Sequence, residues 1–334
     1  MVRAALKPVF SRLGNPLPDA RRQAVFEGHR VSGSSVSVAM CTYGGAKYVR
    51  EQLESIARQT RRPDELVLCD DGSRDRTLDI VDDFARRAPF AIRVVSHRAN
   101  VGVTANFEHA ISLCSKDMIF LCDQDDVWHA DKIETTACAL DGSPDACGAF
   151  SDSAVVDSNL QPAGYSLWDA CGFTPPLRSA FGERAVEMLL DGNKVQGAAL
   201  AFRASCRSIL LPISRRWTYD AWLAVILAAC GLLVIDRELM QYRQHQENWL
   251  GAEVQPKLTR LERQLHKFRR LRRYYVDKLR ETNEFLVQLD ELDARLSLGR
   301  DKFSKALAVT SERRRRLEKR RRRSALWCGL LGAS

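Results

Sequence analysis

The sequence lacks several features that would place it in well-defined protein classes. None of its ten cysteines forms a C-x-x-C pair, so the spacing predicts neither a disulfide framework nor a zinc site. Several cysteines lie inside apolar runs, as small buried residues do in a reducing cytosol. The longest apolar run, residues 221–235, has 15 residues between two aspartates. It is too short for a membrane-spanning helix and predicts a buried helix followed by a strand.

Two further absences concern the first part of the chain. Residues 1–33 contain no continuous apolar segment like that of a signal peptide, and their prolines, glycines and arginines predict a poorly ordered leader. The turn after the first expected strand has no G-x-G-x-x-G sequence. A dinucleotide-binding Rossmann domain is therefore disfavoured, and any phosphate bound there needs another partner.

Charge divides the chain into an acidic body and a basic end. Residues 257–323 hold 23 basic and 10 acidic residues, a net charge of +13. The rest of the chain holds 28 basic and 32 acidic residues, a net charge of −4. This asymmetry predicts a basic appendage on a globular domain. We expect three regions, namely the leader at 1–33, a catalytic domain at 34–252 and a helical, basic C-terminal extension at 253–334.

The first half of the expected domain alternates strands with helices. Apolar runs at 36–41, 65–69, 92–95 and 118–122 are separated by segments with helical spacing of apolar residues. Short loops between such elements imply an α/β fold with a mostly parallel sheet. In the second half we expect strands at 146–156 and 193–203, a flexible loop at 164–176 and a helix at 183–190.

Polar side chains follow three of these strands at the point where each one ends. They are Thr42, Tyr43 and Gly44 after the first strand, Asp70 and Asp71 after the second, and Asp123, Gln124, Asp125 and Asp126 after the fourth. In an open α/β sheet these ends share the edge where ligands bind. Clustered carboxylates repel one another unless a cation joins them, and hard oxygen ligands suit Mg²⁺ or Mn²⁺. Each loop alone also fits ordinary turn chemistry, but the three together favour a nucleotide site.

The motifs at this edge resemble those of glycosyltransferase family 2, whose members have the GT-A fold. Within that family they are most similar to the rhamnosyltransferase-like branch. The resemblance covers residues 35–252 and rests on segments at 38–53, 70–75, 100–102 and 122–128, in order and spacing. It implies an inverting enzyme that takes a sugar from a nucleotide diphosphate, with dTDP-rhamnose as a candidate donor and a growing, lipid-linked surface glycan as the acceptor.

The resemblance also assigns roles to individual residues. The donor-binding set is Thr42, Tyr43, Gly44, Asp70, Asp71, Asn100, Gly102, Asp123, Gln124, Asp125 and Arg243. The metal set is Asp125, Asp126 and His245, of which we expect Asp125 or Asp126 to bind Mg²⁺ or Mn²⁺ directly. The acceptor side has Gln196, Gly197 and Trp222. Relatives often carry Thr-Gly-Cys where this chain has 196–198, which leaves the acceptor open.

Asp220 is the expected catalytic base. It lies in Thr-Tyr-Asp-Ala-Trp, where relatives often have His-Asp-Trp-Trp, so Tyr219 replaces the histidine. An inverting transfer needs a base for the proton of the attacking hydroxyl, and a carboxylate can take it. The alternative is that Asp220 only caps the helix at 221–230. Farther on, Arg243 and His245 belong to a Tyr-Arg-Gln-His segment, in which a guanidinium can neutralise phosphate and an imidazole can complete a metal shell.

The C-terminal extension predicts helices and a surface contact. Leucines and aromatics recur at three- and four-residue steps among charges from 258 to 292, which indicates a long amphipathic helix or a hairpin. Such helices can pack on the domain or on a second subunit. Basic residues at 313–316 and 319–323 precede Trp327, a pattern that suits an anionic membrane surface. Nucleic acid competes for this role, but no nucleic-acid-binding fold accompanies the run.

The leading hypothesis is a metal-dependent glycosyltransferase, peripheral on the cytoplasmic face of the cell membrane. Two alternatives remain. One is a non-catalytic scaffold or nucleic-acid-binding protein with a degenerate transferase fold, which the intact acids oppose. The other is a nucleotidyltransferase, which the missing glycine-rich loop disfavours.

Overall fold

The computed structural model describes residues 33–245, 262–298 and 303–330, with side chains placed at 33–245, 277–298 and 303–326. The expected leader at 1–33 lies outside these residues apart from Gly33. So do residues 246–261, which hold the expected boundary at 252, and the side chain of Trp327.

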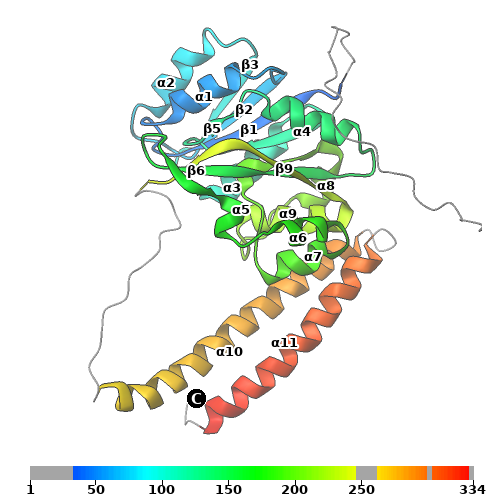
Figure 1. Ribbon diagram of the computed structural model, residues 1–334. Coiled ribbons are helices and arrows are strands. Elements are labelled where there is room, and N and C mark those ends of the chain that lie inside the picture. Colours follow the sequence, from blue (N-terminus) through cyan, green and yellow to red (C-terminus); the bar gives the residue numbers. More distant parts are fainter. Residues whose placement is uncertain (1–32, 246–261, 299–302, 331–334) are drawn as a thin grey trace, which may run out of the picture. The chain divides into compact units, whose positions relative to one another are not determined.

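One mixed sheet forms the centre of the fold (Figure 1). Its strand order is β3-β2-β1-β4-β8-β6-β9-β5, and β7 pairs with β6. The first four strands in this order are parallel to one another, and β6 is parallel to β9, whereas β8 is antiparallel to both its neighbours. The strands are β1 (Val36–Thr42), β2 (Glu65–Asp70), β3 (Ala91–Ser96), β4 (Met118–Cys122), β5 (Val127–Trp128), β6 (Gly148–Val156), β7 (Pro162–Ser166), β8 (Leu200–Arg203) and β9 (Leu232–Arg243).

Helices cover both faces of the sheet because strand residues alternate between two apolar clusters. Val38 and Met40 of β1 pack with the helices α1, α2 and α4, whereas Ala39 and Cys41 pack with α3, α7 and α9. The helices of this part are α1 (Val49–Ala57), α2 (Thr77–Ala85), α3 (Val103–Leu113), α4 (Lys132–Asp141), α5 (Leu167–Ala170), α6 (Pro175–Ser179), α7 (Phe181–Asp191), α8 (Arg207–Leu210) and α9 (Tyr219–Cys230), with short 3₁₀ turns at Gly197–Ala199 and Ala204–Cys206. The mostly parallel α/β sheet expected from the sequence is confirmed.

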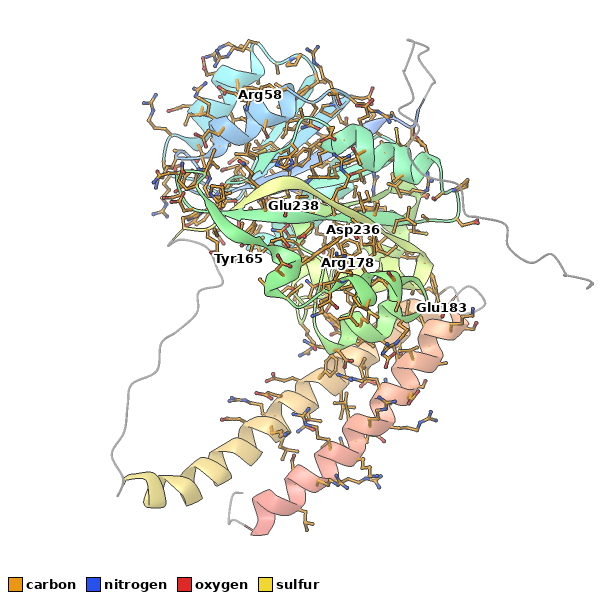
Figure 2. The ribbon with its side chains drawn as sticks, in the orientation of Figure 1. Arg58, Tyr165, Arg178, Glu183, Asp236 and Glu238 are labelled. Carbon is orange, nitrogen blue, oxygen red and sulfur yellow. The ribbon has the colours of Figure 1, made fainter. Side chains whose placement is uncertain are left out.

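Two expectations for the second half are wrong. Residues 164–176 are not a flexible loop, because β7, α5 and the start of α6 occupy them. Trp168 is buried there against Phe150 and Phe173. Arg178 then ties α6 to β9, with its Nε 3.2 Å from Asp236 Oδ2 (Figure 2). The segment at 193–203 is a strand only from Leu200 onward, because a 3₁₀ turn forms first.

The C-terminal extension is a helical hairpin. Helix α10 (Glu262–Ser297) packs along α11 (Ser304–Leu330). Leucines of α10 join the apolar cluster that contains α7 and α9, and Arg314 of α11 pairs with Asp290 and Asp293 of α10. Of the sequence's alternatives, packing on the catalytic part of the chain is therefore the arrangement that the hairpin adopts. No helix in the described residues is both long and apolar enough to cross a membrane.

Candidate active site

The three polar loops expected at one sheet edge do meet there. Thr42 at the end of β1 lies opposite Asp70 at the end of β2. Cys122, which precedes Asp123, lies beside Met40 in the same parallel arrangement. The carboxyl ends of β1, β2 and β4 therefore bring the loops together, as the parallel sheet requires.

Asp70 organises the loop that follows its own strand. Its carboxylate is fully buried and accepts hydrogen bonds from Thr42 Oγ1 at 2.8 Å, from Ser73 N at 2.9 Å and from Gly72 N at 3.1 Å. Ser73 Oγ donates to it as well, at 2.5 Å. The Asp70 carboxylate therefore holds the turn in shape. Neighbouring residues are better placed than Asp70 to contact the nucleobase of a donor.

Asp71 links the second loop to the third. Its Oδ1 accepts from Val101 N at 2.6 Å and its Oδ2 from Gly102 N at 2.9 Å. Gly102 is the N-terminal cap residue of α3. One side chain thus fixes the start of a helix 31 residues away in the sequence, while Asn100 beside it stays exposed.

Gln124 joins the loop after β1 to the loop after β4, residues 123–126, which we call the acidic loop. Its Oε1 accepts from Tyr43 N at 2.8 Å, and its Nε2 donates to Tyr43 O at 3.0 Å. A Cβ on Gly45 would lie only 2.2 Å from Gln124 Oε1, so glycine is needed for this close approach. Gly44 donates from its backbone to Ser73 Oγ at 2.9 Å, and the Tyr43 ring is left 56% exposed at the mouth of the site.

Asp123 contacts Gln196, which was expected on the acceptor side, and Tyr219, which precedes the expected base. Gln196 Nε2 donates to its Oδ2 at 3.3 Å, and the Tyr219 hydroxyl donates to its Oδ1 at 3.4 Å. Burial, with the negative charges of Asp125 and Asp220, raises the pKa of Asp123 to about 7. The structure therefore brings the expected base close enough to influence an acid of the donor loop.

Asp220 lies in the first turn of α9, and its expected alternative role as the N-cap is wrong. The cap position belongs to Thr218, and the helix begins at Tyr219. Asp220 Oδ1 accepts from Ala221 N at 2.7 Å. Burial raises the pKa of this carboxyl above its usual value, opposed by hydrogen bonds from Thr218 and from the backbone. A carboxylate with a raised pKa is a stronger proton acceptor, as a general base requires.

Tyr219 is a site residue that the sequence analysis did not assign. Its ring stacks on Phe107 with centroids 4.2 Å apart, and its hydroxyl reaches Asp123. A Cβ on Gly197 would lie 2.1 Å from this hydroxyl, so Gly197 makes room for the tyrosine. The replacement of the family's histidine by Tyr219 was the available signal.

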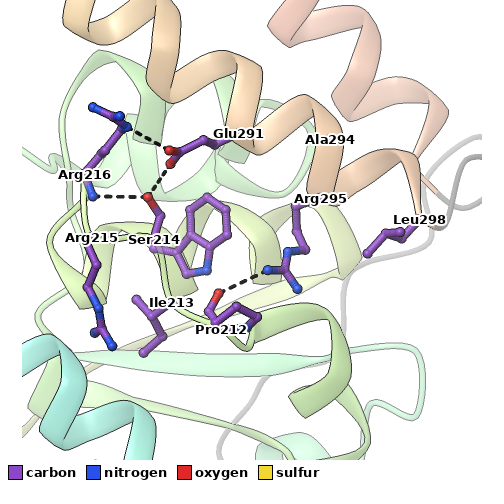
Figure 3. A pocket seen from close by; sticks show the side chains of 10 residues that line it. Pro212, Ile213, Ser214, Arg215, Arg216, Glu291, Ala294, Arg295 and Leu298 are labelled. Carbon is purple, nitrogen blue, oxygen red and sulfur yellow. Dashed lines mark hydrogen bonds and ion pairs between the residues drawn. The ribbon is translucent and has the colours of Figure 1, made fainter.

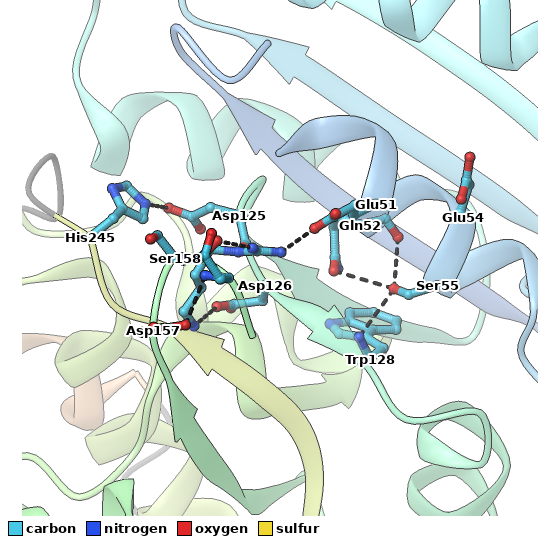
Figure 4. A network of polar contacts seen from close by, with 12 residues as sticks. Glu51, Gln52, Glu54, Ser55, Asp125, Asp126, Trp128, Asp157, Ser158 and His245 are labelled. Atoms are coloured by element: carbon cyan, nitrogen blue, oxygen red, sulfur yellow. Dashed lines mark hydrogen bonds and ion pairs between the residues drawn. The ribbon is translucent and has the colours of Figure 1, made fainter. Parts of the chain in front are cut away.

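The acidic loop pairs two of the three expected metal ligands. His245 Nε2 lies 2.9 Å from Asp125 Oδ2 (Figure 4). The His245 ring also packs on Tyr48, with centroids 4.9 Å apart. The carboxylate oxygen suits Mg²⁺ or Mn²⁺, whereas an imidazole nitrogen is a softer ligand that hard Mg²⁺ takes less readily.

Asp126 corrects the predicted ligand set. Its side chain is buried, and its Oδ1 accepts from Arg243 N at 3.2 Å. Its Oδ2 has no hydrogen-bond partner among the described protein atoms, and burial with the nearby Asp125 and Asp123 charges raises its pKa well above the usual value. Across the described residues, no group of three or more His, Cys, Asp or Glu side chains is placed to hold a metal ion. A cation here would have the Asp125 carboxylate as its oxygen ligand with His245 beside it, and Mg²⁺ commonly binds through one or two carboxylates plus phosphate oxygens of a substrate.

Arg243 is buried and bonds to the backbone of the acidic loop. Its expected contact with the diphosphate is therefore wrong. The side chain is 2% exposed. Its Nε donates to Asp125 O and its Nη1 to Ser158 O, each at 2.8 Å, and its Nη2 pairs with Glu51 (Figure 4). Its guanidinium also lies 4.5 Å from the Tyr48 ring centroid. The charge is used to hold the loop's backbone in place.

Lys132 is a second residue that sequence analysis missed. Its ammonium is buried, donates to Ala198 O at 2.6 Å and lies 4.3 Å from the centroid of the Trp128 ring. Burial lowers its pKa to about 8, against the opposing effect of Cys122, Asp126 and Asp123. It places a positive charge under the acidic loop. Its sequence position at the start of a helix gave no sign of this burial.

Trp222 does not line the acceptor side as expected. Its ring is buried, and its Nε1 donates to Leu210 O at 2.9 Å. It faces the apolar cluster shared with the hairpin, because it lies two residues beyond Asp220 on a different face of α9. Gln196 and Gly197, the other expected acceptor-side residues, do lie beside Asp123 and Tyr219.

Comparison with known proteins gives one match to a family and several partial relatives. The family model described as Glycosyl transferase family 2 matches residues 37–210. An uncharacterized protein of Mycobacterium tuberculosis is 28% identical over 214 residues, which cover 63% of this chain and 59% of that protein. The dTDP-rhamnosyl transferase RfbG of Shigella flexneri is 34% identical over 125 residues, which cover 36% of this chain and 40% of that protein.

The chain thus spans less than two thirds of the length of these curated relatives. Among solved structures, S. aureus TarS 1-349 in complex with UDP-GlcNAc aligns with a TM-score of 0.48 at 18% identity, covering 80% of this chain and 74% of that one.

Proposed function

The chain belongs to glycosyl transferase family 2, and from this premise we propose that it transfers a sugar from a nucleotide-diphosphate donor to an acceptor hydroxyl. The observation that carries the proposal is the meeting of two groups of residues. The loops after β1, β2 and β4 share one edge, and Tyr219, which directly precedes Asp220 in α9, donates from its hydroxyl to Asp123 Oδ1 at 3.4 Å. A donor held by the loops would lie next to a proton acceptor.

In the proposed reaction, Asp220 takes the proton of the acceptor hydroxyl while that oxygen bonds to the anomeric carbon. The bond from this carbon to the diphosphate breaks on the opposite face, so the configuration inverts and the nucleoside diphosphate leaves. Gln196 and Tyr219 hold Asp123, and Arg243 holds the acidic loop's backbone. A Mg²⁺ or Mn²⁺ ion, when bound at Asp125 and His245, supplies positive charge for the diphosphate leaving group.

The finer identity of the substrates is part of the same proposal. The S. flexneri relative supports dTDP-rhamnose as a donor to test. The exposed basic residues Lys319–Arg323 of α11 support attachment to an anionic membrane surface, where a lipid-linked glycan acceptor would be available.

A panel of UDP-, dTDP- and GDP-linked sugars tests the donor. Calorimetry with Mg²⁺, Mn²⁺ or chelator should show one sugar nucleotide that binds in a metal-dependent manner and is slowly hydrolysed. Absence of binding by every sugar nucleotide would contradict the proposal and favour the non-catalytic alternative.

Asp125→Ala tests the cation site within that experiment. It should remove the metal dependence of donor binding without lowering the melting temperature, because Asp125 is a partly exposed side chain. The control is Asp157→Ala, a change at a neighbouring turn, where Asp157 Oδ1 accepts from Asn159 N and Gln161 N. Unchanged metal dependence in Asp125→Ala would place the cation elsewhere.

A further inference from the structure

One face of α10 lies against the segment that leads into Asp220. Phe285, Gln288, Glu291 and Arg295 are spaced three, three and four residues apart, so they share a face of the helix. A neighbouring stripe of leucines, buried in the apolar cluster that also contains Trp222, fixes the helix on the domain. These leucines are Leu286, Leu289, Leu292 and Leu296.

Glu291 makes the central contacts of this face. Its carboxylate accepts from Ser214 Oγ and, at 2.9 Å, from Arg216 Nε (Figure 3). Gln288 Nε2 donates to Arg216 O at 2.5 Å. Two side chains of α10 therefore hold both the side chain and the backbone of Arg216, four residues before Asp220.

Arg295 and Phe285 extend the contact in both directions. Arg295 donates from Nη1 to Leu211 O at 2.6 Å and from Nη2 to Pro212 O at 3.2 Å. The Phe285 ring lies 6.4 Å from the Trp217 ring, centroid to centroid. The α10 face thus contacts the segment from Leu211 to Trp217, directly before the cap of α9.

The segment has polar contacts on both of its sides. A cavity of about 870 Å³ lies between it and α10, lined by Ile213, Arg215, Trp222 and Leu298 among others. On its other side, Glu108 Oε2 accepts from Ile213 N at 2.8 Å and lies 3.5 Å from Arg215. The segment is therefore held between α3 and α10 by hydrogen bonds and ion pairs.

We propose that α10 positions the catalytic base, with Glu291, Gln288 and Arg295 as positioning residues. This inference rests on the proposed function, because it takes Asp220 as the base. The hairpin is then part of the catalytic apparatus, although none of the three residues touches the donor loops in the contacts described above. Misplacing a catalytic group by about 1 Å can cost on the order of 10²-fold in rate.

The test compares Glu291→Ala, Glu291→Gln and Asp290→Asn in the full-length protein. Asp290 is the matched control, because it is an acid of the same helix whose partner is Arg314 of α11. The readouts are the rate of nucleoside diphosphate release at saturating donor, the donor dissociation constant and the melting temperature. The donor is the sugar nucleotide that binds most tightly in the panel above.

We expect Glu291→Ala to lower the rate about 10–100-fold while the donor dissociation constant stays unchanged. Glu291→Gln should recover part of the rate, since one oxygen remains to accept a hydrogen bond, and Asp290→Asn should keep the full rate. An unchanged rate in Glu291→Ala would overturn the inference. So would a parallel loss of donor affinity, which would indicate a general effect on the fold.

Asp220→Asn is measured alongside to separate the two claims. If it lowers the rate and Glu291→Ala does not, the positioning role is wrong and the proposed function stands. If Asp220→Asn keeps the full rate, the assignment of the base fails and the positioning role fails with it.

Discussion

The loops after β1 and β2 and the segment from Leu211 to Trp217, which leads into Asp220, are held in different ways. Asp70 and Asp71 are fixed by hydroxyl and backbone donors from the same small group of parallel strands and loops. The segment before Asp220 is instead held by a helix whose contacting residues lie more than 70 positions farther along the chain. The loops that we propose bind the donor are therefore held by the sheet, whereas the segment before Asp220 is held by the hairpin.

The largest expected effect tests the acceptor side alone. Asp220→Asn should lower transfer roughly 10²–10⁴-fold, because an amide cannot take the hydroxyl proton. Donor affinity should stay within about twofold, since the donor loops are built independently. Rapid-quench turnover and calorimetry measure the two quantities. Near-normal turnover at saturating acceptor would assign Asp220 a structural role only.

The next prediction tests whether the basic residues of α11 have a different role from Glu291 of α10. Replacing the five basic residues Lys319–Arg323 by glutamine should release the protein from anionic vesicles. Each basic residue near such a surface contributes about 1 kcal/mol. Turnover on a soluble acceptor should be unchanged, because these side chains are exposed whereas Glu291 lies at the docked end. Deleting residues 312–334 is a poorer test, since it also removes the buried Leu317 and the Arg313–Asp191 and Arg314–Asp290 pairs.

Vesicle co-sedimentation over a salt series, with RNA and DNA as competitors, measures this effect. Salt should mimic the substitution, because it screens the same charges. If the unmodified protein ignores vesicles or prefers nucleic acid at physiological salt, the membrane assignment is wrong.

A moderate effect on the donor side comes from Asp71→Asn. The amide would present N–H groups to the backbone donors of Val101 or Gly102, leaving one of them unsatisfied. A hydrogen bond to a charged group contributes about 1.5–3 kcal/mol, so the free energy of unfolding should fall by up to that amount, as measured in urea. Asp79→Asn on the exposed surface of α2, beside Arg76, is the control. Equal stability of the two variants would show that the loops do not depend on this clamp.

A further prediction concerns the pH dependence of stability that arises from Lys132, which is buried near the acidic loop. The pKa of Lys132 is lowered to about 8 in the folded protein and is about 10.4 in an unfolded chain. Between these pH values the unfolded chain holds a proton that the folded protein lacks, so this group makes stability rise with pH. Lys132→Met should lose that rise, which amounts to about 1.4 kcal/mol per unit of pKa difference. Urea unfolding from pH 8 to 10 measures it, and parallel curves for the two proteins would contradict it.

The sequence predicted the donor side better than the acceptor side for a physical reason. Acids at strand ends in a parallel sheet must share an edge, so Asp70, Asp71 and Asp123 could be grouped before the fold was known. The burial of Arg243 and Trp222 depends on which way each side chain turns within a packed core, which motif spacing does not specify. Lys132 and the α10 face were missed because their partners come from distant elements. The periodicity from 258 to 292 predicted a helix but not the segment it would hold.

Two glycines described above have a consequence for how related sequences can diverge. A side chain at position 45 would collide with Gln124, and one at position 197 would collide with Tyr219. At position 45 the clash is with the end of a flexible side chain, which can turn away. At position 197 the clash is with the stacked Tyr219 ring, so the tyrosine has to shrink or move before Gly197 is replaced. Positions 197 and 219 should therefore covary among homologues, more strongly than positions 45 and 124. A smaller residue at 219 would open position 197 to substitution and so provide a permissive route to new acceptors.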